Sequence, residues 1–503
     1  MIDRTQPARI MSPRADVGRF FRHSTIYAIG SVVNRAGAFL LLPLYTSRLS
    51  TGEYGTLEMY YVIGAVVSGL LSVGIAHATL RFYFDYAEQR ERDALVSTNL
   101  FASFFISTCG ALLVALLAEP LSHLVVGTQA PQMALPIVLA TLVLELSSQV
   151  SFAYLRAQEK STFFVILSIG KLGVQCVANV IALTRFDAGI VGILFGNFLA
   201  VAAGWLVLVL YTLGKCGVHF ERAKIAPVLR YSLPFLYITI LSLISANLDR
   251  FLINSLISIE AVGLYALATK FAKLIGDLIG EPFNRAYGAF RFTIMKQADA
   301  ATIQANVFRY AAATLAMVSM GVAYFSVDVI RIMAADAYLP AAELIAPLAL
   351  AASVGVLTYI AQTGVLYAKR SNELFRITVV RTIAIAVTAY PAIAAFGLAG
   401  ICALAVADSF FVLILTHRAS QRHFAVTYDL ARLGTLAAIS AAFYGASVPV
   451  SLLPAYLGML VKVLMYGGFL ATLYNSSVLL PVEKNWIRGR LRFATSHKEG
   501  PAA

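Results

Sequence analysis

Long apolar stretches recur along the whole chain and are separated by short polar segments. Each stretch has about twenty residues, enough for an α-helix to cross about 30 Å of hydrocarbon. The pattern therefore predicts an all-α, polytopic membrane protein with about fourteen transmembrane helices. The predicted spans are 24–45, 57–79, 96–118, 133–155, 162–184, 188–212, 232–252, 261–284, 306–328, 343–366, 377–396, 398–416, 430–448 and 455–480.

Two parts of the chain share short motifs at a nearly constant offset. Gln149–Tyr154, which ends the fourth span, resembles Gln362–Tyr367, which ends the tenth, and Glu53–Gly55 resembles Glu260–Gly263. The first six spans and the next six are therefore predicted to form two related, parallel six-helix lobes, to which two C-terminal helices are added. The predicted segments are an N-terminal segment 1–23, a first lobe 24–213, a linker 214–230, a second lobe 231–417, the last two spans 418–481 and a tail 482–503.

The distribution of Lys and Arg predicts the orientation in the membrane. The chain has 39 Lys and Arg against 26 Asp and Glu, a formal net charge of +13. With the N-terminus in the cytoplasm, nearly all basic residues outside the spans fall in cytoplasmic segments, as the positive-inside rule requires. Only Arg48, Arg185, Arg250 and Arg331 fall on the other side. Both termini are therefore predicted to be cytoplasmic, and the basic excess does not indicate nucleic acid as a partner.

The composition agrees with a membrane protein and argues against several kinds of site. Hydrophobic residues make up 59% of the chain and charged residues 13%, whereas soluble domains have about 25% charged residues. Cys109, Cys176, Cys216 and Cys402 are isolated, and their spacing suggests neither a metal site nor a disulfide framework. No Gly-Lys-Ser/Thr phosphate-binding loop is present. We therefore expect no cofactor, no metal and no direct use of ATP.

The eighth span carries four charged residues that point to function. Lys270, Lys273, Asp277 and Glu281 are spaced so that a regular α-helix places them on one face. Charge at membrane depth is costly, so such residues usually face a bundle interior or a water-filled cavity. Two cations on this helix face suggest a transporter with an anionic cargo. Internal pairing of Lys273 with Asp277 is the structural alternative.

Cations and amides in two other spans extend this candidate substrate site. Arg35, with Asn34 beside it, suits a diphosphate because a guanidinium group can bind phosphate oxygens in a fork. In the fifth span Lys171, Gln175 and Asn179 share one helix face. On that face a lysine suits phosphate, and the amides suit sugar hydroxyl groups. Polar contacts between packed helices are the alternative explanation.

Two further cations lie within predicted spans. Arg381, in the eleventh span, is a candidate for cargo contact, although its long side chain could instead reach the cytoplasmic surface. Lys462, in the last span, could contact a lipid phosphate or form an ion pair, and the sequence does not decide between these roles.

Carboxylates at membrane depth are candidates for ion coupling. Glu145 lies well inside the fourth span, where an ionisable group is expensive and usually functional. A salt bridge to Arg35 or Lys171 is the alternative for this residue, and protonation could break such a pair. Asp277 and Glu281 are further candidates for the same role.

Several motifs connect these observations to a known family. The first span and its exit contain Asn34-Arg35, Pro43 and Leu49–Gly55, and the second lobe begins with Tyr231–Pro234, Asp249-Arg250 and Gly263–Tyr265. This pattern resembles the polysaccharide transporter family, the Wzx-type flippases of lipid-linked oligosaccharides in the MATE-like MOP superfamily. The resemblance implies two six-helix bundles around a central cavity, alternating access and a polyprenyl-diphosphate-linked sugar repeat unit as cargo. It also implies coupling to an ion gradient.

The sequence therefore predicts a flippase and not an enzyme. It would move polyprenyl-diphosphate-linked oligosaccharide across the bacterial inner membrane for lipopolysaccharide or exopolysaccharide biosynthesis. Its partners would be this cargo, membrane lipids, and the polysaccharide polymerase and chain-length machinery. A lipid II flippase and a MATE-like drug or cation antiporter are the alternatives. Cationic drugs favour an acidic cavity, whereas the intramembrane charge here is mainly basic. A membrane glycan polymerase is disfavoured because the extracytoplasmic loops are short.

Overall fold

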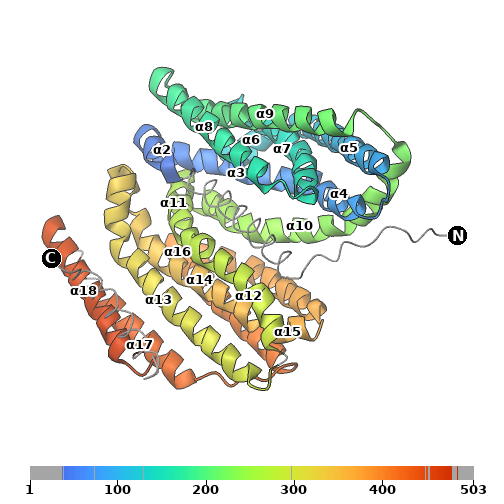
Figure 1. The fold of residues 1–503 in the computed structure, drawn as a ribbon. Coiled ribbons are helices and arrows are strands. Elements are labelled where there is room, and N and C mark those ends of the chain that lie inside the picture. The colour runs from blue at the N-terminus through green and yellow to red at the C-terminus, as the bar shows by residue number, and fades with distance from the viewer. Residues whose placement is uncertain are drawn as a thin grey trace, which may run out of the picture. The chain divides into compact units, whose positions relative to one another are not determined.

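The predicted all-α membrane architecture is confirmed. The computed structural model describes residues 39–478, apart from residues 73, 128–129, 296, 448 and 451–453, together with residues 37 and 484. Within these residues every regular element is a helix, and nine helices are long and apolar enough to cross a membrane. The chain divides into two units, Met1–Gly263 and Leu264–Ala503, each of which is described by itself (Figure 1). The count of about fourteen spans stays a prediction.

The first unit is built around three helices, α7, α8 and α9. The bounds of its helices are Leu42–Arg48 (α2), Thr51–Leu71 (α3), Ile75–Tyr83 (α4), Gln89–Ala115 (α5), Ala118–Val126 (α6), Ala134–Ala157 (α7), Ser161–Arg185 (α8), Gly189–Cys216 (α9), Arg222–Leu256 (α10) and Ile259–Ile275 (α11, which continues into the second unit). α9 packs against both α7 and α8, and α5 covers α7 (Figure 1). α10 packs on α3, α4 and α5. The seventh predicted span thus associates with the first unit, and the predicted lobe boundaries stay predictions.

The second unit is centred on α14, which packs against α13 and α16. The bounds of its elements are Gly276–Gly280 (η1, a π-helical turn), Glu281–Ile294 (α12), Ala300–Met333 (α13), Asp336–Tyr338 (η2), Ala341–Ala361 (α14), Thr363–Tyr367 (α15), Ser371–Gln421 (α16), Leu430–Ser447 (α17) and Ala455–Asn475 (α18). α17 and α18 form a pair that packs on α13 (Figure 1).

Glycines with a left-handed backbone set several helix boundaries. Gly397 interrupts α16 with φ of +59°, which separates the predicted spans 377–396 and 398–416 at the expected place. Gly74 has φ of +71° and divides the predicted span 57–79 into α3 and α4. An L-amino acid with a Cβ atom rarely adopts this conformation, whereas glycine adopts it readily. The expectation of one continuous helix over 57–79 is therefore wrong.

Two glycines of the repeated motifs allow α3 and α11 to touch through their backbones. A Cβ atom on Gly55 would lie 1.9 Å from the carbonyl oxygen of Ile259, and one on Gly263 would lie 2.2 Å from that of Thr51. Atoms cannot approach so closely, so only glycine, which has no Cβ atom, fits at either position. The similarity of Glu53–Gly55 to Glu260–Gly263 thus has a packing reason, since each glycine accommodates the first turn of the other helix.

An ion pair fixes α18 to α13. Lys462 Nζ lies 2.6 Å from Asp328 Oδ2, and the two side chains are only 12% and 17% exposed. Nearby, Tyr466 donates a hydrogen bond to the carbonyl oxygen of Met317 at 3.1 Å. Of the two roles that the sequence left open for Lys462, the structure shows the ion pair.

Replacing either contact glycine should destabilise the first unit. We expect Gly55→Ala and Gly263→Ala each to lower the free energy of unfolding by about 1–3 kcal/mol, because the new methyl group meets a backbone carbonyl that cannot rotate away. Gly434→Ala on α17 is the matched control, since its Cβ atom would meet nothing within 4 Å. Thermal unfolding of the purified protein in detergent measures the difference. Equal thermal unfolding midpoints for Gly55→Ala and Gly434→Ala would contradict the backbone contact.

Replacing one residue of the Lys462–Asp328 pair should destabilise the protein more than replacing both. We expect Asp328→Ala and Lys462→Ala each to destabilise the protein by about 3–5 kcal/mol, because each leaves one charge without its partner away from water. The double variant Asp328→Leu with Lys462→Met should be more stable than either single variant. Unfolding in detergent tests this, and purely additive losses would show that the two charges are not coupled.

Candidate functional site

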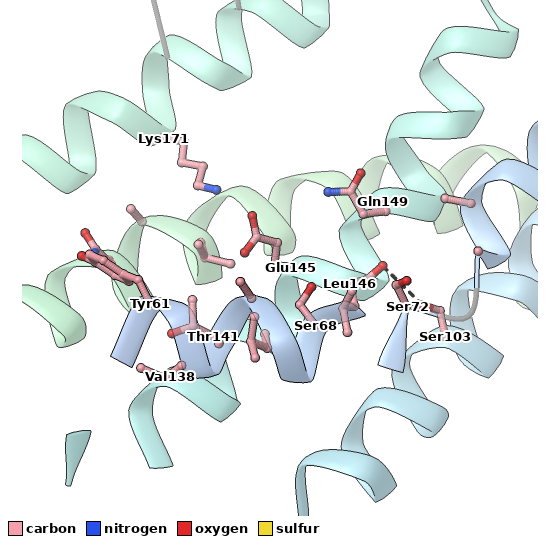
Figure 2. Close-up of a pocket in the computed structure, with 18 of the residues that line it drawn as sticks. Tyr61, Ser68, Ser72, Ser103, Val138, Thr141, Glu145, Leu146, Gln149 and Lys171 are labelled. Carbon is pink, nitrogen blue, oxygen red and sulfur yellow. Dashed lines mark hydrogen bonds between the residues drawn. The ribbon is translucent and has the colours of Figure 1, made fainter. Parts of the chain in front are cut away.

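A polar cavity of about 810 Å³ lies inside the first unit, among α3, α4, α7, α8 and α9. Figure 2 shows Lys171 from α8 and Glu145 from α7 pointing toward one another in this cavity. The polar and charged residues that line it are Tyr61, Ser68, Ser72, His77, Ser103, Thr141, Glu145, Gln149, Arg156, Lys171, Gln175 and Asn197. Three of the residues predicted from the sequence, Lys171, Gln175 and Glu145, thus meet in one place.

A second hollow, of about 470 Å³, lies between α7 and α8 with α9 as its floor. We call it the α7–α8 hollow. The residues that it shares with the polar cavity are Glu145, Gln149, Arg156, Lys171, Gln175 and Val201. Its remaining lining residues are Ser148, Phe152, Phe164, Leu167, Ser168, Leu172, Gly204, Trp205 and Leu208. The two spaces therefore adjoin one another at these shared residues.

The charge of Lys171 is not cancelled within the described part of the chain. Neither Lys171 nor Glu145 forms an ion pair or a hydrogen bond with another described residue. Their mutual salt bridge, one alternative that the sequence suggested for Glu145, is therefore not formed. An ammonium group carries three donors, so Lys171 can offer its donors and its charge to an anion in the cavity.

An amide network holds Gln175 and Asn197 at the cavity wall. Gln175 donates a hydrogen bond to Asn197 Oδ1 at 2.7 Å, and Asn197 Nδ2 donates to the Tyr61 hydroxyl at 2.7 Å. Asn179 is fully buried and donates to the Tyr45 hydroxyl at 2.6 Å and to Asn197 Oδ1 at 3.2 Å. Asn179 is not among the residues that line the cavity, and its contact with the cargo stays a prediction.

The break between α3 and α4 brings a helix start to the cavity. Ser72, Gly74, Ala76 and His77 line the wall there, and no side chain caps the first turn of α4. The first backbone N–H groups of a helix lack partners within the helix and, with the helix dipole, favour negative charge. Two of these groups are paired here, the Ile75 N–H with Ser72 O at 3.3 Å and the His77 N–H with Gly74 O at 3.0 Å, so the helix dipole is the main contribution of this helix start.

The charged residues predicted for the eighth span lie in the second unit. Lys270 and Lys273 belong to α11, Asp277 belongs to η1, and Glu281 begins α12. The expectation of a regular α-helix is wrong here, because a π-helical turn has more residues per turn than an α-helix and shifts the face that follows it. Glu281 also forms an ion pair with Arg285 at 2.7 Å. The roles of these residues in cargo binding and ion coupling stay predictions.

Arg381 is neutralised by a partner in the second unit. Its Nη2 lies 2.8 Å from Asp408 Oδ2, and its Nε donates to both oxygens of that carboxylate at 2.9 and 3.1 Å. This bidentate ion pair balances the charge that the sequence suggested for cargo contact. Asn34 and Arg35, the other predicted cargo contacts, lie outside the described residues.

Tyr61 and Asn197 are among the lining residues that the sequence analysis did not identify as site residues. Asn197 is an amide within an apolar span, and polar groups at that depth are usually functional or hydrogen-bonded, so this signal was present. Tyr61 gives no comparable signal, because a tyrosine is common on any half-buried helix face. Its role follows only from the contact with Asn197.

Comparisons with known proteins agree with this architecture. A model of the family described as polysaccharide biosynthesis protein matches residues 20–287. The solved structure of the lipid II flippase MurJ in an inward closed conformation is similar over 90% of this chain and 99% of that chain, with 12% identity and a TM-score of 0.66. A variant of the Vibrio cholerae MATE transporter VcmN is similar over 80% and 96%, with 14% identity and a TM-score of 0.56.

A third structure, an inward-facing multidrug resistance MATE family transporter of the MOP superfamily, is similar over 78% of this chain and 97% of that chain, with 15% identity and a TM-score of 0.54. Among curated proteins, no sequence matches significantly. The structural likenesses show that the chain has the fold of MOP-superfamily transporters.

Proposed function

Because the chain belongs to the polysaccharide biosynthesis protein family, we propose that it is a flippase for polyprenyl-diphosphate-linked oligosaccharides. The protein moves the sugar-bearing diphosphate headgroup across the bacterial inner membrane by alternating access, while the polyprenyl chain stays in the bilayer. The translocated repeat unit then serves surface or exopolysaccharide biosynthesis. The polymerase and chain-length machinery that would use this product are its proposed partners.

The observation that carries this proposal is that Lys171 lines the cavity without an ion pair to any residue that the structure describes. A diphosphate loses favourable interactions with water when it enters hydrocarbon, and a cation beside it restores part of them through Coulomb attraction and charge-assisted hydrogen bonds. The start of α4 lines the same space and adds its dipole. Lys171 is therefore the residue that we expect to hold the diphosphate.

The amides and hydroxyls near Lys171 fit the sugar part of such a cargo. Gln175 lies one turn further along α8, where a neighbour on the same face has its Cβ atom about 6 Å away. Gln175, Asn197 and Thr141 offer neutral donors and acceptors at the wall. A sugar hydroxyl both donates and accepts hydrogen bonds, so this set can bind a pyranose next to the phosphate.

Glu145 is the proposed coupling group. Its carboxylate faces Lys171 (Figure 2) and competes with a phosphate for the same cation. Protonation of Glu145 removes that competition, so proton binding and cargo binding favour each other. Deprotonation then helps to displace the diphosphate from Lys171 and to release the cargo.

Loss of the Lys171 charge should abolish most transport. We expect Lys171→Gln to weaken cargo binding and to slow translocation by at least about tenfold, since a hydrogen bond to a charged group contributes about 1.5–3 kcal/mol. Lys171→Arg should keep most of the activity because it keeps the charge. Lys215→Gln is the matched control, since Lys215 is exposed in the last turn of α9 and lines neither space.

One assay measures the translocation of lipid-linked oligosaccharide across the membrane of vesicles that contain the purified protein. A second assay measures how much of this lipid accumulates in cells. Full translocation by Lys171→Gln would overturn the assignment of the cargo site. Accumulation of lipid II in cells that carry this variant would redirect the assignment to that cargo.

Removal of the Glu145 carboxyl should change how cargo binding depends on pH. We expect wild-type protein to bind the lipid diphosphate more tightly as pH falls, because protonation of Glu145 removes a negative charge that faces Lys171 and repels the diphosphate. Glu145→Gln should bind it tightly throughout and should release it slowly. All other groups are the same in the two proteins, so the difference between the two pH profiles isolates Glu145. Parallel profiles would rule out this coupling role.

A further inference from the structure

The α7–α8 hollow has a mixed lining of polar and apolar side chains. Seven of its fifteen lining residues are polar or charged, and most of the others are aromatic or aliphatic. Glu145 and Arg156 are the first and the last of its lining residues on α7, and Lys171 lies on α8. Such a lining does not suit a hydrocarbon chain, because a polar group that loses water without gaining a partner costs free energy. It suits a ligand that has polar and apolar surfaces side by side.

One face of each of three helices builds this lining. The lining residues recur every three or four positions along α7, α8 and α9, as residues on one side of an α-helix do. α7 and α8 both pack on α9 and make few contacts with each other, and Gly204 leaves part of the α9 floor without a side chain. Phe152 and Phe164 meet edge to face, with ring centroids 5.3 Å apart. The resulting volume of about 470 Å³ falls within the roughly 300–1,000 Å³ that is usual for small-molecule sites.

Trp205 gives the hollow an aromatic surface that is held in place. Its indole N–H donates a hydrogen bond to Ser147 Oγ at 2.8 Å, and Phe104 on α5 stacks on its ring with centroids 5.8 Å apart. These two neighbours fix the orientation of an indole that also lines the hollow. A pyranose ring has C–H groups on its faces and hydroxyl groups at its edge. The C–H groups can pack on an aromatic side chain while the hydroxyls bond to polar groups around it.

Two polar side chains of the hollow have unused hydrogen-bonding capacity. Ser168 on α8 is only 5% exposed, and Gln149 on α7 lines both the hollow and the polar cavity. Neither side chain forms a hydrogen bond with another residue that the structure describes. Buried polar groups in proteins are nearly always hydrogen-bonded. The Ser168 hydroxyl therefore indicates a partner that the described part of the chain does not supply.

We propose that the α7–α8 hollow binds a sugar ring of the repeat unit that the cargo carries. The ring packs on Trp205, and its hydroxyls bond to Ser168 and Gln149 and to the charged groups of the lining. This inference rests on the proposed function, because it starts from a diphosphate held by Lys171. Gln175 lines both the polar cavity and the hollow. The first ring after the diphosphate can therefore lie at Gln175 and the next ring in the hollow.

The test compares the binding of two lipids to the full-length protein in nanodiscs. One lipid is polyprenyl diphosphate without sugar, and the other is the complete lipid-linked repeat unit purified from cells that lack this protein. The ratio of their two dissociation constants is the sugar advantage. Wild-type protein should bind the repeat unit at least about tenfold more tightly, because several hydrogen bonds to the sugars each add to the affinity.

Two variants of the hollow should lower the sugar advantage. We expect a reduction of about two- to tenfold for Ser168→Ala, which removes one neutral hydrogen bond, and of about three- to tenfold for Trp205→Leu, which removes the aromatic surface. Both variants should bind the sugar-free diphosphate within about twofold of wild type, since Lys171 is unchanged. Ser107→Ala on α5 and Phe195→Leu on α9 are the matched controls, because neither position lines the hollow or the polar cavity.

The possible outcomes separate this inference from the proposed function. A full sugar advantage in both variants would overturn the sugar subsite and leave the flippase proposal intact. Equal weakening of both lipids by the variants would show a role in folding or in lipid contact, and would also overturn the subsite. Equal binding of the two lipids by wild-type protein would do the same. Failure of wild-type protein to bind either lipid, or the absence of lipid-linked repeat units from cells that lack it, would instead overturn the proposed function.

Discussion

The cost of placing charge in hydrocarbon explains how three described cations of this protein, Lys462, Arg381 and Lys171, are arranged. Two cations in the second unit, Lys462 and Arg381, each have a carboxylate within hydrogen-bonding distance. Such pairing keeps a charge within a membrane-spanning region tolerable, although it leaves little attraction for a third group. Lys171 is arranged differently, since it faces a cavity and forms no ion pair with a described residue. An anionic headgroup can supply the missing charge, which is why this position can serve transport.

The internal repeat shows how two similar backbones come to carry different chemistry. Gly189 and Gly397 both have positive φ, and they follow the segments that carry Lys171 and Arg381 respectively. This agrees with the predicted repeat, which stays a prediction. The side chains differ, because Arg381 is held by Asp408 whereas Lys171 remains available. The proposed diphosphate site thus belongs to the first unit.

The sequence was informative where a local pattern determines the structure. Apolar runs located the spans, and the helical spacing of Lys171 and Gln175 placed both on a cavity wall. The same reasoning failed where the helix was not regular, as at Gly74 and in η1, because spacing indicates a common face only while the period stays constant. Periodicity along one helix also does not identify partners on another. The contact between Asn197 and Tyr61 therefore required the structure.

Cells that lack this protein provide the most direct test of the flippase proposal. The measurement is the amount and the membrane side of polyprenyl-diphosphate-linked repeat units, together with the amount of surface polysaccharide. We expect the lipid-linked units to accumulate on the cytoplasmic side and surface polysaccharide to be lost. Unchanged lipid intermediates and unchanged surface glycan, with altered sensitivity to cationic drugs, would contradict the proposal and favour an exporter.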